Sequence, residues 1–351
     1  MFIKKLLIVG LSDSIGGIET LFYGLFKGKN RYFDISFLFF SPHGAYEEEF
    51  LNNGYKIYHM GSRKRNYVKF NSLVADFFQK HNDFDYVWVN TASTSMYQFQ
   101  YFAKKYTNAK VITHSHGTTF DATSGKILYF LNTILGRINF KKVINNTDFY
   151  FCCSRAAGIA LFGEEKQSDL IMIKNGVSEE RFSFSSEKRS NFRIQYGIDS
   201  NKVVIGFVGR LSEQKNPIRA LEIFDEYHKI NNNSILVIAG DGNLGDSVKE
   251  KIKELGIIND VLLLGFYKEV DLLYCGSDLL LMPSLFEGLP LGGIEAQMTG
   301  LPCLFSDSIT DELGITNLAR FLSLSEKNEV WVKQIRQLLD ENTNISSKTY
   351  C

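Results

Sequence analysis

Residues 203–217 read Val-Val-Ile-Gly-Phe-Val-Gly-Arg-Leu-Ser-Glu-Gln-Lys-Asn-Pro: an apolar run, a charged loop and a proline that can start a helix. An apolar run followed by a helix is typical of a strand in a parallel sheet whose faces are covered by helices. The same alternation occurs in two series along the chain, and this stretch opens the second series. The fold class that we predict is therefore α/β, with two Rossmann-like, doubly wound parallel-sheet domains.

The length of 351 residues also favours two domains, because it exceeds what one ordinary hydrophobic core supports. The expected strands span residues 5–9, 34–40, 86–90, 110–113 and 149–152 in the first series, and residues 203–208, 234–239, 261–264, 279–282 and 302–305 in the second. We place the first domain at residues 1–182, a polar linker at 183–202 and the second domain at 203–325. Residues 326–351 are expected to form a helix that crosses back to the first domain, followed by a tail.

Composition and charge argue against several classes of protein. The 39 basic and 39 acidic side chains give a formal net charge of zero, so charge gives no reason to expect nucleic acid as a partner. The five cysteines are odd in number and form no C-x-x-C pair, which argues against a disulfide framework or a structural zinc site. No stretch approaches the roughly 18 apolar residues needed to cross a bilayer. We therefore expect a cytoplasmic protein that does not span the membrane.

Residues 125–142 place apolar side chains on one helical face, with Lys126 and Arg137 among the interspersed basic residues. We favour a helix that buries this apolar face in the first domain. The alternative is peripheral contact with an anionic membrane surface or with a lipid-linked acceptor.

The most informative segment runs from Met282 to Ala296 and contains two glutamates in a Gly/Pro-rich context. Glu287 follows an expected strand, and Glu295 falls in the first turns of the next helix. A loop that leads into a helix exposes backbone N–H groups to anions. Glu287 can accept hydrogen bonds from sugar hydroxyls, and Glu295 from a ribose diol, as an acidic residue does in dinucleotide sites. The alternative is a solvated loop glutamate and a helix-start glutamate favoured by the helix dipole.

Two cations, Arg210 and Lys215, follow the strand at 203–208 and precede a helix that starts at Pro217. A planar guanidinium and a mobile ammonium over one loop suit a diphosphate. Such cations stabilise the charge that develops on a departing nucleoside diphosphate. Two surface cations are the alternative. Weaker signals come from Gly240 and Gly242, which permit a tight turn or a close ligand approach, and from Phe266, which could border a nucleobase.

The first half has two polar segments at expected strand ends. Gly16 and Gly17 open the first helix and could approach a phosphate, although the G-x-G-x-x-G dinucleotide fingerprint is absent. His114 and His116 could contact a sugar or transfer a proton, or they could be structural. No nearby ligands complete a zinc set, so we expect no metal site.

In this order, the motifs resemble glycosyltransferase family 4, a family of retaining enzymes with the GT-B fold. The matching segments are Gly16-Gly17-Ile18-Glu19, His114-Ser115-His116-Gly117, Asn175-Gly176-Val177, Gly209-Arg210 through Lys215, Gly240-Asp241-Gly242, and Glu287 through Glu295. They cover most of the chain, and the glutamate pair and the Gly-Arg…Lys segment are the specific ones. The resemblance implies two facing Rossmann-like domains with a cleft between them. It also extends, through 114–117 and 151–158, to the branch that builds bacterial capsular and exopolysaccharides.

The resemblance implies a role for each matching position. Arg210 and Lys215, next to Gly209, would hold the donor diphosphate; Glu287 would contact the donor sugar and Glu295 the ribose. The segment of Gly288, Leu289, Pro290 and Leu291 would bind sugar and phosphate through its backbone N–H groups. Gly16 and Gly17 would approach the donor from the other domain. His116 would be the active-site histidine, and His114, Lys126 and Arg137 would lie on the acceptor side.

The expected reaction is transfer of a sugar, with retained configuration, from a nucleotide sugar such as a UDP-sugar to a hydroxyl of a glycan or lipid-linked acceptor. No cofactor and no metal are expected, because the two cations can take the electrostatic role of a metal and no Asp-x-Asp donor motif occurs. Two rivals remain: a GT-B enzyme of another reaction, such as an epimerase or phosphorylase, and a non-catalytic carbohydrate-binding protein. Product analysis with and without an acceptor distinguishes a glycosyltransferase from an epimerase or phosphorylase. Substitution of Arg210 or Lys215 distinguishes it from a non-catalytic protein, whose function would not change.

Overall fold

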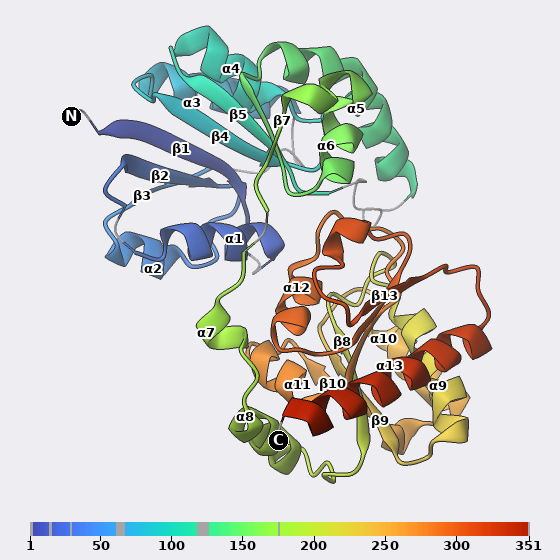
Figure 1. Ribbon diagram of the computed structural model, residues 1–351. Coiled ribbons are helices and arrows are strands. Elements are labelled where there is room, and N and C mark those ends of the chain that lie inside the picture. The colour runs from blue at the N-terminus through green and yellow to red at the C-terminus, as the bar shows by residue number, and fades with distance from the viewer. Residues whose placement is uncertain are drawn as a thin grey trace. The chain divides into compact units, whose positions relative to one another are not determined.

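The computed structural model describes residues 3–13, 16–28, 30–60, 67–117, 126–174 and 176–349; for residues 67, 68, 126–132 and 342–349 it describes the backbone alone. The chain divides into two compact units, residues 1–176 and 177–351 (Figure 1). Each unit is built on one parallel sheet, which confirms the predicted fold class.

Unit 1 contains a seven-stranded sheet in the order β3-β2-β1-β4-β5-β6-β7. Its strands are β1 (Lys4–Leu11), β2 (Phe33–Phe39), β3 (Lys56–His59), β4 (Tyr86–Thr91), β5 (Lys110–Ser115), β6 (Phe149–Cys152) and β7 (Leu170–Met172). Its helices are α1 (Gly17–Phe26), α2 (Glu47–Asn52), α3 (Tyr67–Lys80), α4 (Gln98–Tyr106), α5 (Lys126–Asn145) and α6 (Arg155–Phe162), with a 3₁₀ turn at Glu164–Asp169.

Both faces of the unit 1 sheet are buried, which explains its continuous apolar strands. Successive side chains of a strand point to opposite faces. Leu7 and Val9 of β1 accordingly pack in the cluster formed with α3 and α4. Leu6 and Ile8 pack in the cluster formed with α1 and α2, which lie on the other side of the sheet (Figure 1).

Unit 2 contains a six-stranded sheet in the order β10-β9-β8-β11-β12-β13. Its strands are β8 (Val203–Val208), β9 (Ser234–Ala239), β10 (Val261–Gly265), β11 (Leu279–Met282), β12 (Cys303–Ser306) and β13 (Ala319–Leu322). Its helices are α7 (Glu179–Phe182), α8 (Ser186–Gln195), α9 (Pro217–Ile230), α10 (Gly245–Leu255), α11 (Val270–Gly276), α12 (Leu291–Met298) and α13 (Asn328–Thr349), with 3₁₀ turns at Ile258–Asp260 and Asp311–Leu313.

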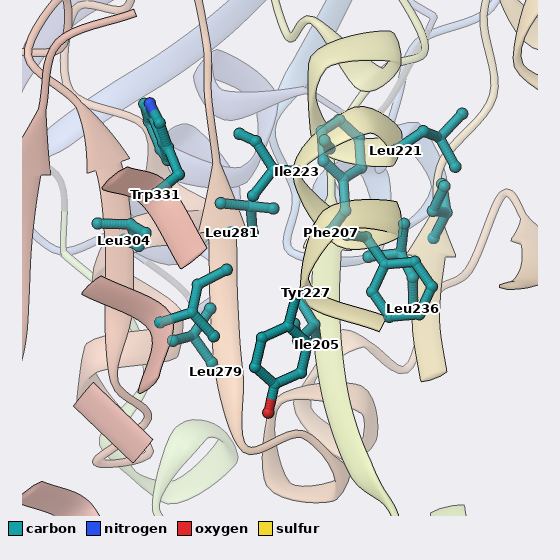
Figure 2. Close-up of a cluster of buried hydrophobic side chains, with 14 of the residues drawn as sticks. Ile205, Phe207, Leu221, Ile223, Tyr227, Leu236, Leu279, Leu281, Leu304 and Trp331 are labelled. Carbon is teal, nitrogen blue, oxygen red and sulfur yellow. The ribbon is translucent and has the colours of Figure 1, made fainter. Parts of the chain in front are cut away.

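The core of unit 2 joins one face of this sheet to three helices, α9, α10 and α13. Figure 2 shows Phe207 of β8 and Leu281 of β11 in one cluster with Ile223 of α9 and Trp331 of α13. These side chains are fully buried or nearly so. On the opposite face, α11 approaches β8 closely: a Cβ added to Gly206 would lie 3.2 Å from a methyl carbon of Leu273.

Two predicted boundaries differ from the structure. The division falls after Gly176, and residues 183–202 contain the helix α8 rather than a polar linker. This helix packs against α11 through Phe192 and Arg193. Because only these few residues face inward, the sequence of α8 shows little helical periodicity. The last helix, α13, places Trp331, Ile335 and Leu338 in the core of unit 2, where we had expected a helix returning to the first domain.

Each strand predicted from the sequence is present, with ends that differ by at most two residues. The edge strands β3 and β13 were not predicted. They are four residues long and only partly buried, so they lack the apolar run of a central strand.

Candidate active site

The candidate site of unit 2 lies at the carboxyl ends of β8 and β11. These two strands are neighbours, but the chain continues from β8 to β9 on one side and from β11 to β12 on the other. The loops that follow β8 and β11 therefore diverge. In open α/β sheets such a switch point is where ligands bind.

An ion pair joins these two loops. Lys215 Nζ, from the loop after β8, lies 2.6 Å from Glu287 Oε1, from the loop after β11; their side chains are 19% and 8% exposed. Gln214 Nε2 donates to Glu287 Oε2 at 3.3 Å and to the carbonyl of Phe286 at 3.1 Å. Both carboxylate oxygens of Glu287 thus have a polar partner, as a buried carboxylate requires.

Backbone contacts hold the two loops in register. The N–H of Leu285 donates to the carbonyl of Gln214 at 2.7 Å, and Asn216 Nδ2 donates to the carbonyl of Pro283 at 3.2 Å. Asn216 has φ 55°, in the left-handed region that Asn tolerates better than most residues, and Pro217 then starts α9. The sharp turn at Asn216 brings Lys215 back over the end of β8.

The loops after β8 and β9 also approach each other through glycine. Gly240 has φ +149°, and a Cβ there would lie 1.9 Å from the carbonyl oxygen of Gly209. A Cβ on Gly242 would lie 2.3 Å from the carbonyl oxygen of Leu211. The methylene chain of Lys215 covers Gly209, whose added Cβ would lie 3.2 Å from Lys215 Cδ. Arg210 occupies the same loop with an exposed side chain.

Glu295 lies on α12, the helix into which the second loop leads. Its Oε2 accepts a hydrogen bond from the phenol of Tyr274 on α11 at 3.2 Å. Burial raises the pKa of Glu295 to about 7. The preceding residues Gly288, Leu289 and Pro290 are buried, and Leu291 is the first residue of the helix. The loop, the helix start and Glu295 thus form one continuous segment, as predicted.

Phe266 follows β10 and is 58% exposed. The N–H of Gly240 donates to the carbonyl of Gly265 at 2.7 Å, which connects Phe266 to the glycine turn after β9. The structure therefore brings the ends of β8, β9, β10 and β11 together through named contacts. The roles of Phe266 and Glu295 toward a nucleoside stay predictions.

In unit 1, His116 lies at the carboxyl end of β5 and contacts the neighbouring strand β4. Its Nε2 is 2.8 Å from Asn90 Oδ1, and Asn90 Nδ2 donates to the carbonyl of Val9 in β1 at 3.0 Å. His116 as a residue is partly exposed, yet desolvation lowers the pKa of its imidazole to about 3. His116 is thus a neutral imidazole oriented by an amide.

His114 is placed differently from our prediction. Its side chain is fully buried, with the rings of Trp88, Phe151 and His116 around it at centroid distances of 5.8, 6.1 and 3.9 Å. Burial, and to a smaller extent the adjacent imidazole of His116, lowers the pKa of His114 to about 2. A fully buried side chain cannot touch an acceptor. His114 therefore supports the ring of His116 instead of lying on the acceptor side as we had expected.

Gly16 and Gly17 lie at the start of α1, next to the end of β1. The carboxylate of Glu19 accepts hydrogen bonds from the N–H and the hydroxyl of Ser12 at 2.8 and 2.9 Å. A Cβ on Gly16 would lie 2.9 Å from Glu19 Oε2. Glu19 therefore connects the first turn of α1 to Ser12, the residue after β1.

The remaining predicted positions fall on α5 and at the division between the units. Arg137 is exposed on α5, and Lys126 begins that helix with a side chain outside the described atoms. Asn175 lies outside the described residues, next to Gly176, at which unit 1 ends. Among the residues that the structure describes, no three His, Cys, Asp or Glu residues gather as a metal site. No helix there is long and apolar enough to cross a bilayer.

Three polar residues of these sites were not singled out from the sequence: Gln214, Tyr274 and Asn90. Asn90 ends an expected apolar strand, and Gln214 precedes a candidate cation, so the positions of these two residues indicated a possible role in a site. Tyr274 lies within an apolar helix, and its position gave no such indication. In each case the partner comes from another strand or helix, which only the fold brings near.

Comparison with known proteins shows that this chain is similar to glycosyltransferases. The family model for glycosyl transferases group 1 matches residues 188–349. The chain is 29% identical over 341 residues to the putative glycosyltransferase EpsF of Bacillus subtilis, covering 95% of this chain and 87% of EpsF. It is 29% identical over 239 residues to a UDP-Gal:α-D-GlcNAc-diphosphoundecaprenol α-1,3-galactosyltransferase of Escherichia coli, covering 65% of this chain and 59% of that enzyme.

The same fold occurs in solved structures. Anabaena Alr3699/HepE in complex with UDP and glucose superposes with a TM-score of 0.78 at 18% identity, covering 99% of this chain and 91% of HepE. At that identity the likeness concerns the fold, and it supports the GT-B class.

Proposed function

We propose that the protein transfers a sugar from a nucleotide-sugar donor to a hydroxyl acceptor with retained anomeric configuration, because residues 188–349 match the family model for glycosyl transferases group 1. The observation that carries this proposal is the Lys215–Glu287 pair at the β8/β11 switch point. A cation and a carboxylate held side by side suit the two ends of an activated sugar: the diphosphate and the sugar hydroxyls.

Lys215 provides charge at the leaving group. An ammonium has three N–H donors, so Lys215 can hold Glu287 and a diphosphate oxygen together. Arg210, exposed in the same loop, provides a second cation with a planar fork. A cation placed in advance stabilises the charge that grows on the departing diphosphate, so these residues need no metal ion to act.

Glu287 acts as a fixed acceptor for donor-sugar hydroxyls in this mechanism. Its oxygens are engaged by Lys215 and Gln214, which lowers its nucleophilicity toward an anomeric carbon. This favours a front-face reaction, in which the leaving phosphate assists deprotonation of the acceptor, over a covalent glycosyl-enzyme. No carboxylic acid has to protonate the leaving group, unlike in a glycosidase.

We propose a uridine diphosphate sugar as donor, and a lipid-linked glycan of a bacterial surface polysaccharide as acceptor. Support comes from similar proteins: HepE was crystallised with UDP and with UDP-glucose, and the Escherichia coli relative is named for UDP-Gal and a diphosphoundecaprenol-linked acceptor. The identity of the sugar is left to experiment.

The test is a panel of nucleotide sugars, incubated with and without lipid-diphosphate-linked acceptors, with products analysed by NMR. A glycoside that keeps the donor's anomeric configuration supports the proposal. An inverted product contradicts retention, an acceptor-independent epimer indicates an epimerase, and a sugar phosphate formed only with inorganic phosphate indicates a phosphorylase.

Substitutions connect that activity to the site. Arg210→Ala and Lys215→Ala should each lower kcat/KM by about 10²–10³, the scale for losing one transition-state charge contact. Lys249→Ala, which removes an exposed cation of α10, is the matched control and should leave kcat/KM unchanged. Near-normal turnover in both site variants would support a non-catalytic role for these cations.

We also propose that α5 contacts the membrane surface where a lipid-linked acceptor resides. Ile134 and Ile138 are 38% and 63% exposed, and Arg137 and Lys141 are exposed on the same side of the helix. Exposed apolar residues flanked by cations are typical of helices that lie on anionic bilayers. The protein should co-sediment with vesicles that contain phosphatidylglycerol and should not co-sediment with neutral vesicles. Ile138→Asp should abolish the co-sedimentation. Equal binding to both vesicle types would contradict this contact.

A further inference from the structure

The carboxylate assigned to the ribose has a partner that the proposed reaction does not use. Glu295 Oε2 accepts a hydrogen bond from the Tyr274 phenol at 3.2 Å, and Tyr274 is 1% exposed. Burial raises the pKa of Tyr274 well above its ordinary value, so the phenol stays protonated and keeps donating. Only one oxygen of Glu295 is engaged in this contact.

The fold fixes the position of the phenol. Tyr274 is on α11, and its ring lies 6.2 Å from that of Phe182 in α7. On the side of α12, a Cβ on Gly292 would lie 3.0 Å from the Tyr274 hydroxyl, so the absence of a side chain lets the phenol pass toward Glu295. Three helices thus define where this hydroxyl lies.

The groups that act on Glu295 come from α7 and α11. Tyr274 and Arg181 favour the charged carboxylate, and Asp271 opposes it. Arg181 is itself held by Asp271 at 3.2 Å and by the carbonyl of Lys268 at 2.7 Å. Cys303 of β12 raises the pKa of Tyr274 and is not among the groups that shift the pKa of Glu295. Desolvation is the largest influence, and the result is a carboxyl group that titrates near neutral pH.

We propose that Tyr274 is a positioning residue for nucleotide binding: its phenol holds Glu295 as an oriented carboxylate, and nucleoside diphosphate binding is thereby coupled to release of a proton. The proposal rests on the ribose role of Glu295 in the proposed function. A carboxylate can accept hydrogen bonds from two ribose hydroxyls, whereas a protonated carboxyl has less acceptor capacity. Binding of the ribose therefore favours loss of any proton on Glu295 to solvent.

The direction of the pH effect follows from the protonation of the free protein. Below about pH 7, free Glu295 carries a proton that must be lost, so affinity should rise as pH increases and level off above that value. Removing the phenol removes a hydrogen bond to the charged form, which raises the pKa of Glu295 further. In Tyr274→Phe the rise in affinity should therefore occur at higher pH.

Calorimetry of UDP binding between pH 6 and 8.5, in pairs of buffers with different ionisation enthalpies, measures affinity and proton release together. Glu295→Gln has no titrating group at this position, so it reports the pH dependence that comes from the phosphate of UDP itself, whose second ionisation is near pH 6. Relative to Glu295→Gln, the wild type should release more protons near pH 7. Tyr274→Phe should bind several-fold more weakly at pH 6.5 and approach the wild type at pH 8.5.

Tyr227→Phe is the matched control, because Tyr227 is a buried tyrosine of the same unit whose phenol accepts a hydrogen bond from Asn231, the residue after α9. It should reproduce the wild-type curve. A Tyr274→Phe variant that binds equally weakly at every pH would show a merely structural role and overturn the proposal. So would a wild type that releases no more protons than Glu295→Gln. If the wild type binds none of UDP, GDP and ADP, the proposed function itself fails.

Discussion

Glu287 Oε1 lies 2.6 Å from Lys215 Nζ, and the two residues reach this contact from loops that follow different strands of one sheet. The strand order brings β8 and β11 together, and the chain direction then sends their loops apart. A charge pair at such a point is largely shielded from water by its own loops. Its two members should therefore depend on each other for stability as well as for activity.

Substitution of one partner of this pair should cost more than substitution of both. Lys215→Met leaves a buried carboxylate without its cation, and we expect a loss of about 3 kcal/mol in the free energy of unfolding. The double variant Lys215→Met/Glu287→Gln should recover most of that loss, because no buried charge is left, yet remain inactive. Urea denaturation and turnover assays measure the two effects. Strictly additive stability losses would contradict the coupling.

Gly240→Ala should disrupt the contact between the loops after β8 and β9. The added Cβ would lie 1.9 Å from the carbonyl oxygen of Gly209, at a φ of +149° that an alanine rarely adopts. We expect a loss of more than about 2 kcal/mol and a large fall in nucleotide affinity. Gly245→Ala is the control, since a Cβ there meets nothing within 4 Å at the start of α10. Equal melting temperatures for the two variants would contradict the close approach.

Acid should destabilise unit 1 through its buried histidines. The folded pKa values of His114 and His116 are lowered to about 2 and about 3, whereas the unfolded chain takes up protons below about pH 6.5. Stability should therefore fall as pH decreases from about 6.5, by up to about 1.4 kcal/mol per pH unit for each histidine. His114→Phe should reduce the slope measured by urea unfolding between pH 7.5 and 5. His43→Phe, at an exposed position, should leave the slope as in the wild type; an unchanged slope in His114→Phe would refute the assignment.

Asp278 should be important for the packing of α8. It accepts hydrogen bonds from Arg189 at 2.6 Å, from Arg193 at 2.8 Å and from the N–H of Val204 at 2.8 Å. Asp278→Asn keeps the shape but leaves a buried guanidinium without its counter-charge, for an expected loss of about 2–4 kcal/mol. Asp246→Asn, in an exposed ion pair with Lys249, should change stability by less than about 0.5 kcal/mol. Chemical denaturation of both variants tests this, and a comparably small effect at position 278 would contradict the role of the network.

Local sequence was enough to predict the strands and the positions that follow them. Central strands of a parallel sheet are apolar on both faces, so β8 and β11 are visible as apolar runs, and parallel order places the residues after them at one edge. Arg210, Lys215, Glu287 and Glu295 could be named as candidates on that basis alone. The edge strand β13 and the helix α8 were missed, because few of their side chains are buried and their patterns are correspondingly weak.

The sequence by itself therefore determined the fold class and the segments that carry the site. Only the tertiary structure decided which side chains meet: Lys215 with Glu287, Tyr274 with Glu295, and His116 with Asn90. It also decided that His114 is buried while His116, two residues further on, is partly exposed. The physical reason is that strand and helix patterns report local burial, whereas partners and desolvation depend on elements that are distant along the chain and adjacent in the folded sheet.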